Sequence, residues 1–75
     1  MKLLAFGKIA EIIGKQEIEI ENFPNTDILV GYLQQQYPAL KDLKFSIAID
    51  KKQVSGNVSI TTDAEVALLP PFSGG

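Results

Sequence analysis

The stretch Glu65-Val66-Ala67-Leu68-Leu69 decides the fold of this chain, together with the similar stretch Lys2-Leu3-Leu4-Ala5-Phe6. Both stretches are apolar at consecutive positions, which face opposite sides of a sheet when the backbone is extended. Strands that are apolar on both faces are typical of the interior of a sheet. We therefore predict that the first and last strands of the chain lie side by side at the sheet centre. The pattern alone leaves open which of their faces is covered.

Two helices are expected between these strands. The first is short, spans 8–13 and stops at a glycine, which commonly ends helices. The second spans 26–36, with Thr26 as its N-cap, and ends because Pro38 cannot continue it. Gly31 lowers its stability by about 0.5–1 kcal/mol relative to alanine, so we expect close backbone packing there. Helical spacing predicts an apolar stripe made of Ile28, Leu29, Tyr32, Leu33 and Tyr37.

The remaining strands are indicated by period-two patterns. Residues 16–21 alternate glutamate with isoleucine, as in a strand with one buried and one solvated face. A third strand is expected over 45–49, followed by a turn over 50–53. We expect Val54 and the segment 58–60 to form a short edge pairing.

This order of elements predicts an α+β fold. One long helix across one face of a mixed four- to five-stranded sheet satisfies it, and that is the ubiquitin-like β-grasp arrangement. The expected domain spans 1–69, and an extended tail with two terminal glycines spans 70–75. Because the helix covers only one face, apolar side chains of the central strands on the other face are either surface residues or contacts for a partner.

Composition excludes several kinds of function. The chain has no histidine and no cysteine, and therefore lacks the commonest general base, the thiolate nucleophile and the soft metal ligands. Its seven lysines, no arginine and nine carboxylates give a net charge of −2, which argues against nucleic-acid binding. No apolar run is long enough for a membrane span, and no secretory layout is present. We expect a cytoplasmic protein held together by its core alone.

The last six residues begin with two prolines and finish with two glycines, Pro70-Pro71-Phe72-Ser73-Gly74-Gly75. The two prolines cannot continue a strand ladder and hold the chain extended. Phe72 offers an aromatic anchor, Ser73 is small, and two residues without side chains fit a narrow channel. We predict that this tail delivers its terminal carboxylate into the active site of another protein.

The last thirteen residues, from Asp63-Ala64-Glu65 to Gly74-Gly75, resemble the small subunits of molybdopterin synthases, a family of ubiquitin-like sulfur carriers. The opening run from Leu3-Leu4-Ala5-Phe6 to Gly14 is also similar to that family, so the resemblance covers essentially the whole chain. Two positions depart from the pattern. Ala10 stands where the family often has arginine, and Thr62-Asp63-Ala64 replaces an Asp-Gly-Asp turn.

The resemblance implies that Gly75 is the reactive residue. A separate ubiquitin-activating-like adenylyltransferase would use ATP to adenylate its carboxylate, and a sulfurtransferase would supply the sulfur of a thiocarboxylate. No cofactor would then be bound stably by the chain itself. The resemblance also implies a large catalytic subunit, joined with the carrier in a heterotetramer. The donated sulfur would build the dithiolene of molybdopterin from a pterin precursor, in molybdenum cofactor biosynthesis.

The chain would not be catalytic alone, and it would insert its tail, Pro70 to Gly74, into the large subunit. Phe6, Leu69 and Phe72 are predicted to contact the partners. Three other functions stay open at this point. The chain could carry sulfur for thiamine or for a thiolated tRNA base, it could be a modifier conjugated to lysines, or it could be a β-grasp binding module without chemistry.

Overall fold

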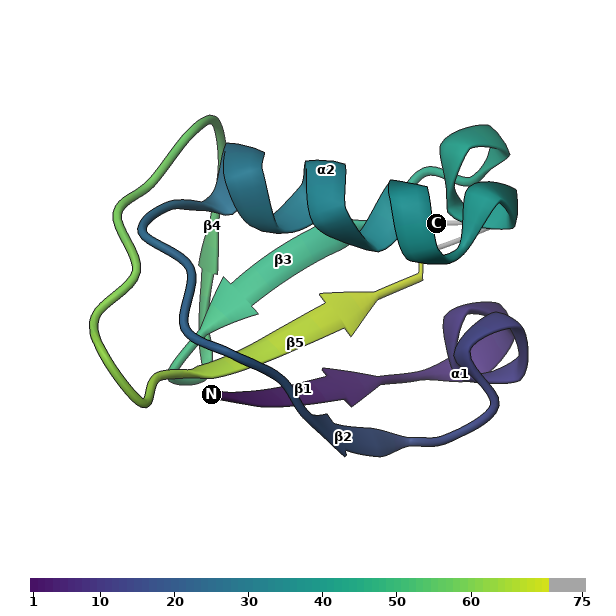
Figure 1. Ribbon diagram of the computed structural model, residues 1–75, viewed down its shortest axis with the longest axis horizontal. Helices are drawn as coiled ribbons and strands as arrows, with labels where there is room; N and C mark the ends of the chain where they lie inside the picture. The colour runs from purple at the N-terminus through teal and green to yellow at the C-terminus, as the bar shows by residue number, and fades with distance from the viewer. Residues whose placement is uncertain (71–75) are drawn as a thin grey trace.

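A computed structural model of the chain describes residues 1–70. Within that range a five-stranded sheet has the strand order β2-β1-β5-β3-β4, and helix α2 lies across one of its faces (Figure 1). The elements in chain order are β1 (Lys2–Ala5), α1 (Gly7–Ile13), β2 (Glu17–Glu19), α2 (Thr26–Gln36), the 3₁₀ helix η1 (Pro38–Asp42), β3 (Ser46–Ile49), β4 (Lys52–Val54) and β5 (Glu65–Leu69). The predicted α+β, β-grasp architecture is confirmed.

The central pairing is the one expected from the apolar strands. Strands β1 and β5 are parallel neighbours, with Lys2 opposite Glu65 and Ala5 opposite Leu68. Strand β3 pairs antiparallel with the other side of β5, and β2 pairs antiparallel with β1. The first and last strands therefore lie side by side in the interior of the sheet.

The structure settles which face of the central strands is covered. Leu3, Val66 and Leu68 are fully buried, and Ala5 is nearly so. These side chains belong to one core cluster with residues of α1, α2, η1 and the connecting segments, namely Met1, Ile9, Leu29, Leu33, Leu40, Ile60 and Ala64. The alternate residues of β1 and β5 face away from α2, because successive side chains of a strand point to opposite faces.

The N-cap of α2 is Asn25, so the prediction of Thr26 was wrong. The Asn25 side chain accepts a hydrogen bond from the Ile28 N–H at 2.9 Å, which is the usual capping contact. Thr26 is instead buried and ties α2 to a distant loop. Its hydroxyl donates to the Gly56 carbonyl at 3.2 Å and accepts from the Val58 N–H at 3.0 Å.

Two further expectations about α2 were wrong. A Cβ added to Gly31 would meet no atom within 4 Å, so this glycine makes no close packing contact. Ile28, placed in the apolar stripe by its spacing, is half-exposed, although Thr26 and Leu29 in the same turn are buried. Leu29 and Leu33 carry the burial of the helix.

The expected edge pairing also differs from the structure. Val54 lies in β4 opposite Ile47, and the tight turn is shorter than expected, because it is centred on Asp50 and Lys51. The segment 58–60 runs beside the start of α2 rather than beside Val54, with a single bridge between Asn25 and Ser59. Asp50 and Lys51, the two residues of the β3–β4 turn, both have positive φ, which matches the twist of a two-residue hairpin. Among the helices of residues 1–70, none has the length and apolar character needed to cross a membrane.

Candidate functional site: the base of the tail and the open sheet face

The tail follows directly on the central strand of the sheet. Strand β5 lies between β1 and β3, is paired on both sides and ends at Leu69. Pro70 follows and is partly buried. The other predicted tail residues, Pro71, Phe72, Ser73, Gly74 and Gly75, lie outside the described residues, and so does the chemistry predicted for Gly75. The starting point of the tail is therefore set by the centre of the sheet.

Gly7 and Pro70 form the base of the tail. Gly7 has a φ of +56°, and a Cβ built on it would lie 3.3 Å from Cγ of Pro70. Such a separation is tighter than an ordinary van der Waals contact, so an alanine at this position would press on the proline ring. The first turn of α1 and the first residue after β5 thus pack against each other.

The structure brings two of the predicted partner contacts together. Phe6 keeps an extended backbone, with φ −130° and ψ 154°, so it continues the alternation of β1. Continuing the parallel register by one residue beyond Ala5 and Leu68 sets Phe6 beside Leu69. Phe6 is 46% exposed, and Leu69 is half-buried. Phe72, the third predicted contact, lies outside the described residues.

Further small and apolar residues extend this surface, which sequence reasoning did not assign to it. Leu4, Ala67 and Ala48 lie opposite one another across three strands, on the same face as Phe6 and Leu69. Leu4 and Ala67 are half-buried, whereas Ala48 is buried and adds little exposed surface. We call the surface made by these five residues the open-face patch. The signal for it was present in the sequence, because period two links Leu4 to Phe6 and Ala67 to Leu69 once the covered face is known.

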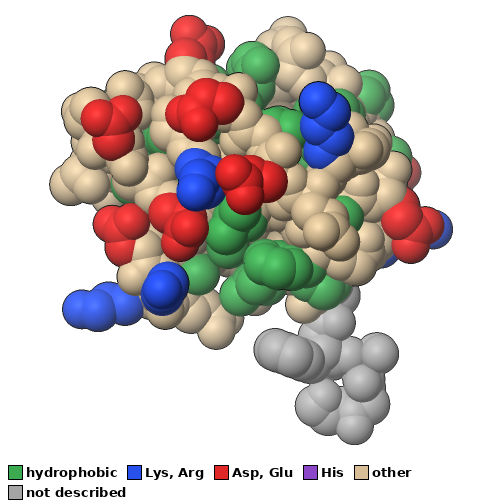
Figure 2. Space-filling model, turned by 90° about the horizontal axis from the view of Figure 1, so that it is seen from below, with side chains coloured by type: hydrophobic (Ala, Val, Ile, Leu, Met, Phe, Trp, Pro, Cys, Tyr) green, Lys and Arg blue, Asp and Glu red, His purple; other side chains and the backbone are tan. Residues whose placement is uncertain are grey.

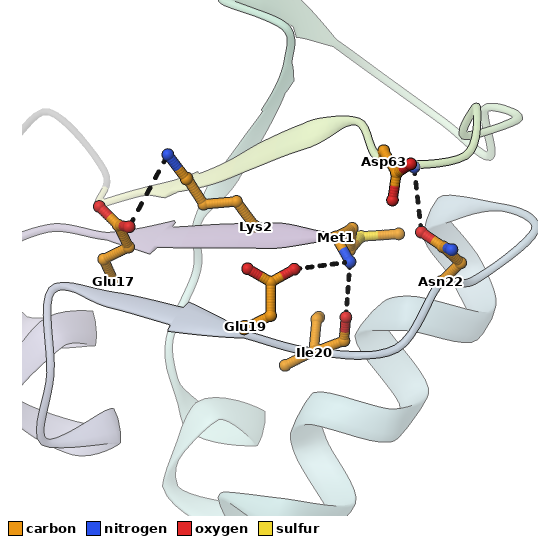
Figure 3. Close-up of polar contacts among 7 residues, drawn as sticks. All are labelled: Met1, Lys2, Glu17, Glu19, Ile20, Asn22 and Asp63. Carbon is orange, nitrogen blue, oxygen red and sulfur yellow. Dashed lines mark hydrogen bonds and ion pairs between the residues drawn. The ribbon is translucent and has the colours of Figure 1, made fainter.

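Charged groups occupy the other half of the same sheet face (Figure 3). Nζ of Lys2 lies 3.7 Å from Oε2 of Glu17, and the ammonium of Met1 lies 3.3 Å from Oε2 of Glu19. The same ammonium donates to the Ile20 carbonyl at 2.6 Å. Seen from the β2 side, acidic and lysine side chains spread over part of the surface, and a group of hydrophobic side chains lies next to them (Figure 2). One face of the sheet therefore combines an apolar region with a charged one.

The described side chains do not gather into a metal site. Among residues 1–70 no group of three carboxylates is arranged to hold an ion. What the geometry provides is a tail anchored at the sheet centre and an apolar surface beside its base.

Comparison with known proteins identifies the family. The ThiS family matches residues 3–75, which is nearly the whole chain. The molybdopterin synthase sulfur carrier subunit of Dictyostelium discoideum is 32% identical over 99% of this chain and 94% of that protein. The subunit of the same name from Caenorhabditis briggsae is 30% identical, over 100% of this chain and 96% of that protein.

Solved structures agree on the fold. A putative molybdopterin converting factor, subunit 1, from Pyrococcus furiosus superposes with a TM-score of 0.80 at 18% identity, over 95% of both chains. The small archaeal modifier protein 1 of Methanosarcina acetivorans superposes with a TM-score of 0.81 at 24% identity, covering 99% of this chain and 94% of that one. The family match spans residues 3–75 and the solved structures share the fold of the sheet and helix, and this chain belongs to the ThiS family.

Proposed function

We propose that this chain is the sulfur carrier subunit of a molybdopterin synthase and acts in molybdenum cofactor biosynthesis. The observation that carries the proposal is the end-to-end match to curated carrier subunits, which runs through the terminal Gly-Gly. The fold supports it, because the tail begins where the central strand β5 ends. The similarity to the archaeal modifier proteins, at 24% and 19% identity, concerns the fold alone.

The proposed chemistry takes place at the carboxylate of Gly75. An activating enzyme joins this carboxylate to the α-phosphorus of ATP, and pyrophosphate leaves. A sulfur nucleophile, supplied at the oxidation level of sulfide by a sulfurtransferase, then attacks the acyl carbon and AMP leaves. The product is a C-terminal thiocarboxylate. The nucleophile is thus provided without a cysteine, which agrees with the composition. Because activation consumes ATP, the proposal places the carrier in the cytoplasm.

Transfer of the sulfur is proposed to occur in the large catalytic subunit. The thiocarboxylate sulfur forms a bond to a carbon of the pterin precursor while a carbon–oxygen bond at that carbon breaks, and the oxygen leaves as water or on the phosphate. A second water molecule then cleaves the acyl–sulfur bond. The sulfur stays on the pterin as half of the dithiolene, and the carrier returns with a free carboxylate. The second sulfur comes from a second loaded carrier. Groups that activate the pterin belong to the large subunit.

The open-face patch is proposed to dock on these partners. It adjoins the base of the tail, since Phe6 and Leu69 precede Gly7 and Pro70 directly. Large exposed aromatic side chains next to small ones are typical of the centre of an interface. Docking by this patch would place the start of the tail at the entrance of the partner's channel.

The experiment is reconstitution from purified components. The thiocarboxylated carrier, the candidate large subunit and the cyclic pterin precursor are mixed, and molybdopterin is detected by its oxidised fluorescent product. We expect product only with the loaded carrier. Failure with this pterin, combined with sulfur transfer to a thiazole precursor or a tRNA, would replace the proposal by one of the other sulfur pathways.

A matched pair of variants tests the docking surface. Phe6 and Ile28 are the two large hydrophobic residues most exposed within residues 1–70, at 46% and 50%. We expect Phe6→Glu to weaken binding to the large subunit roughly tenfold or more, because a charge would be buried in the interface. Ile28→Glu, at the far end of α2, should leave binding unchanged. Equal effects of the two variants would show that the patch is not the interface.

A further inference from the structure

A groove lies between strand β2 and helix α2, on the opposite side of β1 from the tail strand. Its volume is about 420 Å³, within the range of ligand-binding clefts. Leu33, fully buried, forms its floor, while Tyr32 and Tyr37 lie along its helical wall. Ile18 and Ile20 line the wall on the sheet side, and the charged residues Lys15, Glu17 and Glu19 border the groove as well. This groove is separate from the open-face patch and plays no part in the proposed sulfur chemistry.

Strand β2 is an edge strand, and its outer hydrogen-bonding groups can be assigned. Ile20 exchanges hydrogen bonds with Met1, and the Ala5 N–H donates to the Gln16 carbonyl at 2.9 Å. Facing pairs of antiparallel strands alternate between hydrogen-bonded and non-hydrogen-bonded pairs. The main-chain groups of Gln16, Ile18 and Ile20 therefore point to β1. Those of Glu17 and Glu19 point outward, and in residues 1–70 no strand pairs with them.

The side chains of the same strand alternate in chemistry. Ile18 lies opposite the buried Leu3 and lines the groove. By alternation the side chains of Glu17 and Glu19 point to the opposite face of the sheet, while the two residues also border the groove along the strand edge. The two carboxylates are 60% and 78% exposed. Each carboxylate already has one cationic neighbour, Lys2 for Glu17 and the Met1 ammonium for Glu19, and both keep most of their side-chain surface open to solvent.

From these observations we propose that β2 binds an extended segment of a partner protein in which basic and apolar residues alternate. The segment adds a sixth strand to the sheet and forms hydrogen bonds with the main-chain N–H and C=O groups of Glu17 and Glu19. Its apolar side chains enter the groove beside Tyr32 and Tyr37. Its lysine or arginine side chains meet the two carboxylates across the strand, where opposite charges stabilise a cross-strand pair.

A second copy of this chain fits the site less well. The other edge of the sheet, β4, carries Lys52 and Val54, which share one face because they are two residues apart. Strand β4 therefore cannot place a lysine against the glutamates and a valine in the groove at the same time. The alternation of β2 selects a partner in which the basic and apolar residues occupy opposite faces.

The probe is a synthetic peptide with blocked ends that alternates lysine and valine, KVKVKV. It is titrated into the full-length protein and followed by amide NMR and hydrogen exchange. We expect shifts at Tyr32 and Tyr37, and slower exchange of the Glu17 and Glu19 amides, which become hydrogen-bonded. Shifts without this added protection would overturn strand addition, and so would pairing of two copies through β2.

Charge and main-chain contacts are tested separately. The double variant Glu17→Lys/Glu19→Lys should bind KVKVKV at least about tenfold more weakly and gain affinity for EVEVEV, because opposite charges across the strand are exchanged. The control Glu11→Lys/Asp42→Lys changes the net charge equally at exposed sites elsewhere and should keep the original preference.

Methylation of the peptide backbone provides the second test. Antiparallel addition predicts loss of binding when the lysine amides are N-methylated but not when the valine amides are, and parallel addition predicts the reverse. Equal effects of the two peptides, or no effect of either, would contradict the proposal. None of these measurements involves Gly75, so their failure leaves the sulfur-carrier function untouched.

Discussion

Gly7 and Pro70 pack so closely that a single Cβ on Gly7 would approach the proline ring to 3.3 Å. The two residues are 63 positions apart in the chain and meet because β1 and β5 are parallel neighbours that end at the same edge of the sheet. Parallel pairing thus joins the start of α1 to the first residue of the tail.

Replacing Gly7 with alanine should lower stability. The backbone at this position is left-handed, with φ +56°, which costs a residue with a side chain about 1–2 kcal/mol, and the contact with Pro70 adds to that. Chemical denaturation of the variant measures the sum. Gly56→Ala is the matched control, because Gly56 has φ +71° and open space around it. An equal decrease in the free energy of unfolding of the two variants would show that the contact with Pro70 adds nothing to the cost of Gly7→Ala.

Replacing Gly31 with alanine should raise stability by about 0.8–1 kcal/mol. The added methyl group meets no atom within 4 Å, so only the backbone effect remains, and it favours alanine inside a helix. For a domain of this size the melting temperature should rise by about 4–8 °C. Gly14→Ala serves as the contrast, since its φ of +89° should make the same substitution destabilising. A lower melting temperature for the Gly31 variant would mean that the helix surface there is in contact with something.

The two neighbouring lysines of the β3–β4 hairpin should respond in opposite ways to glycine. Lys51 has a φ of 72°, a left-handed conformation in which its Cβ has a steric cost. Lys51→Gly removes that cost and should stabilise the protein by about 1 kcal/mol. Lys52 lies in β4, where glycine should destabilise by roughly 0.5–1 kcal/mol. Both variants remove one positive charge, so the difference between their unfolding free energies reports backbone conformation alone. Effects of the same sign would contradict the assigned turn.

Deleting Gly75 should abolish sulfur loading and leave the melting temperature nearly unchanged. The reason is that the described core is made by residues between Met1 and Leu68, while the proposed reactive group is the terminal carboxylate. Intact mass after incubation with the activating enzyme, ATP and the sulfurtransferase measures loading as the exchange of oxygen for sulfur. A large drop in melting temperature would mean that the tail is a structural element.

The elements themselves were readable from local patterns, because strand and helix periods are properties of short windows. The doubly apolar strands 2–6 and 65–69 identified the sheet centre, and the proline and glycine ending identified the tail. One of the errors arose where two elements compete for the same residue. Thr26 has the side chain of an N-cap, yet it is buried against the loop at Gly56 and Val58, and Asn25 caps the helix instead.

The sequence by itself determined the architecture, the central position of the first and last strands and the absence of histidine and cysteine chemistry, since these follow from composition and from periods of two and 3.6. Only the tertiary structure decided which face of β1 and β5 is open, that the parallel register sets Phe6 beside Leu69, and that β2 and α2 leave a groove between them. Those facts depend on where α2 crosses the sheet, and a contact between segments distant in the chain leaves no trace in the local pattern of either one.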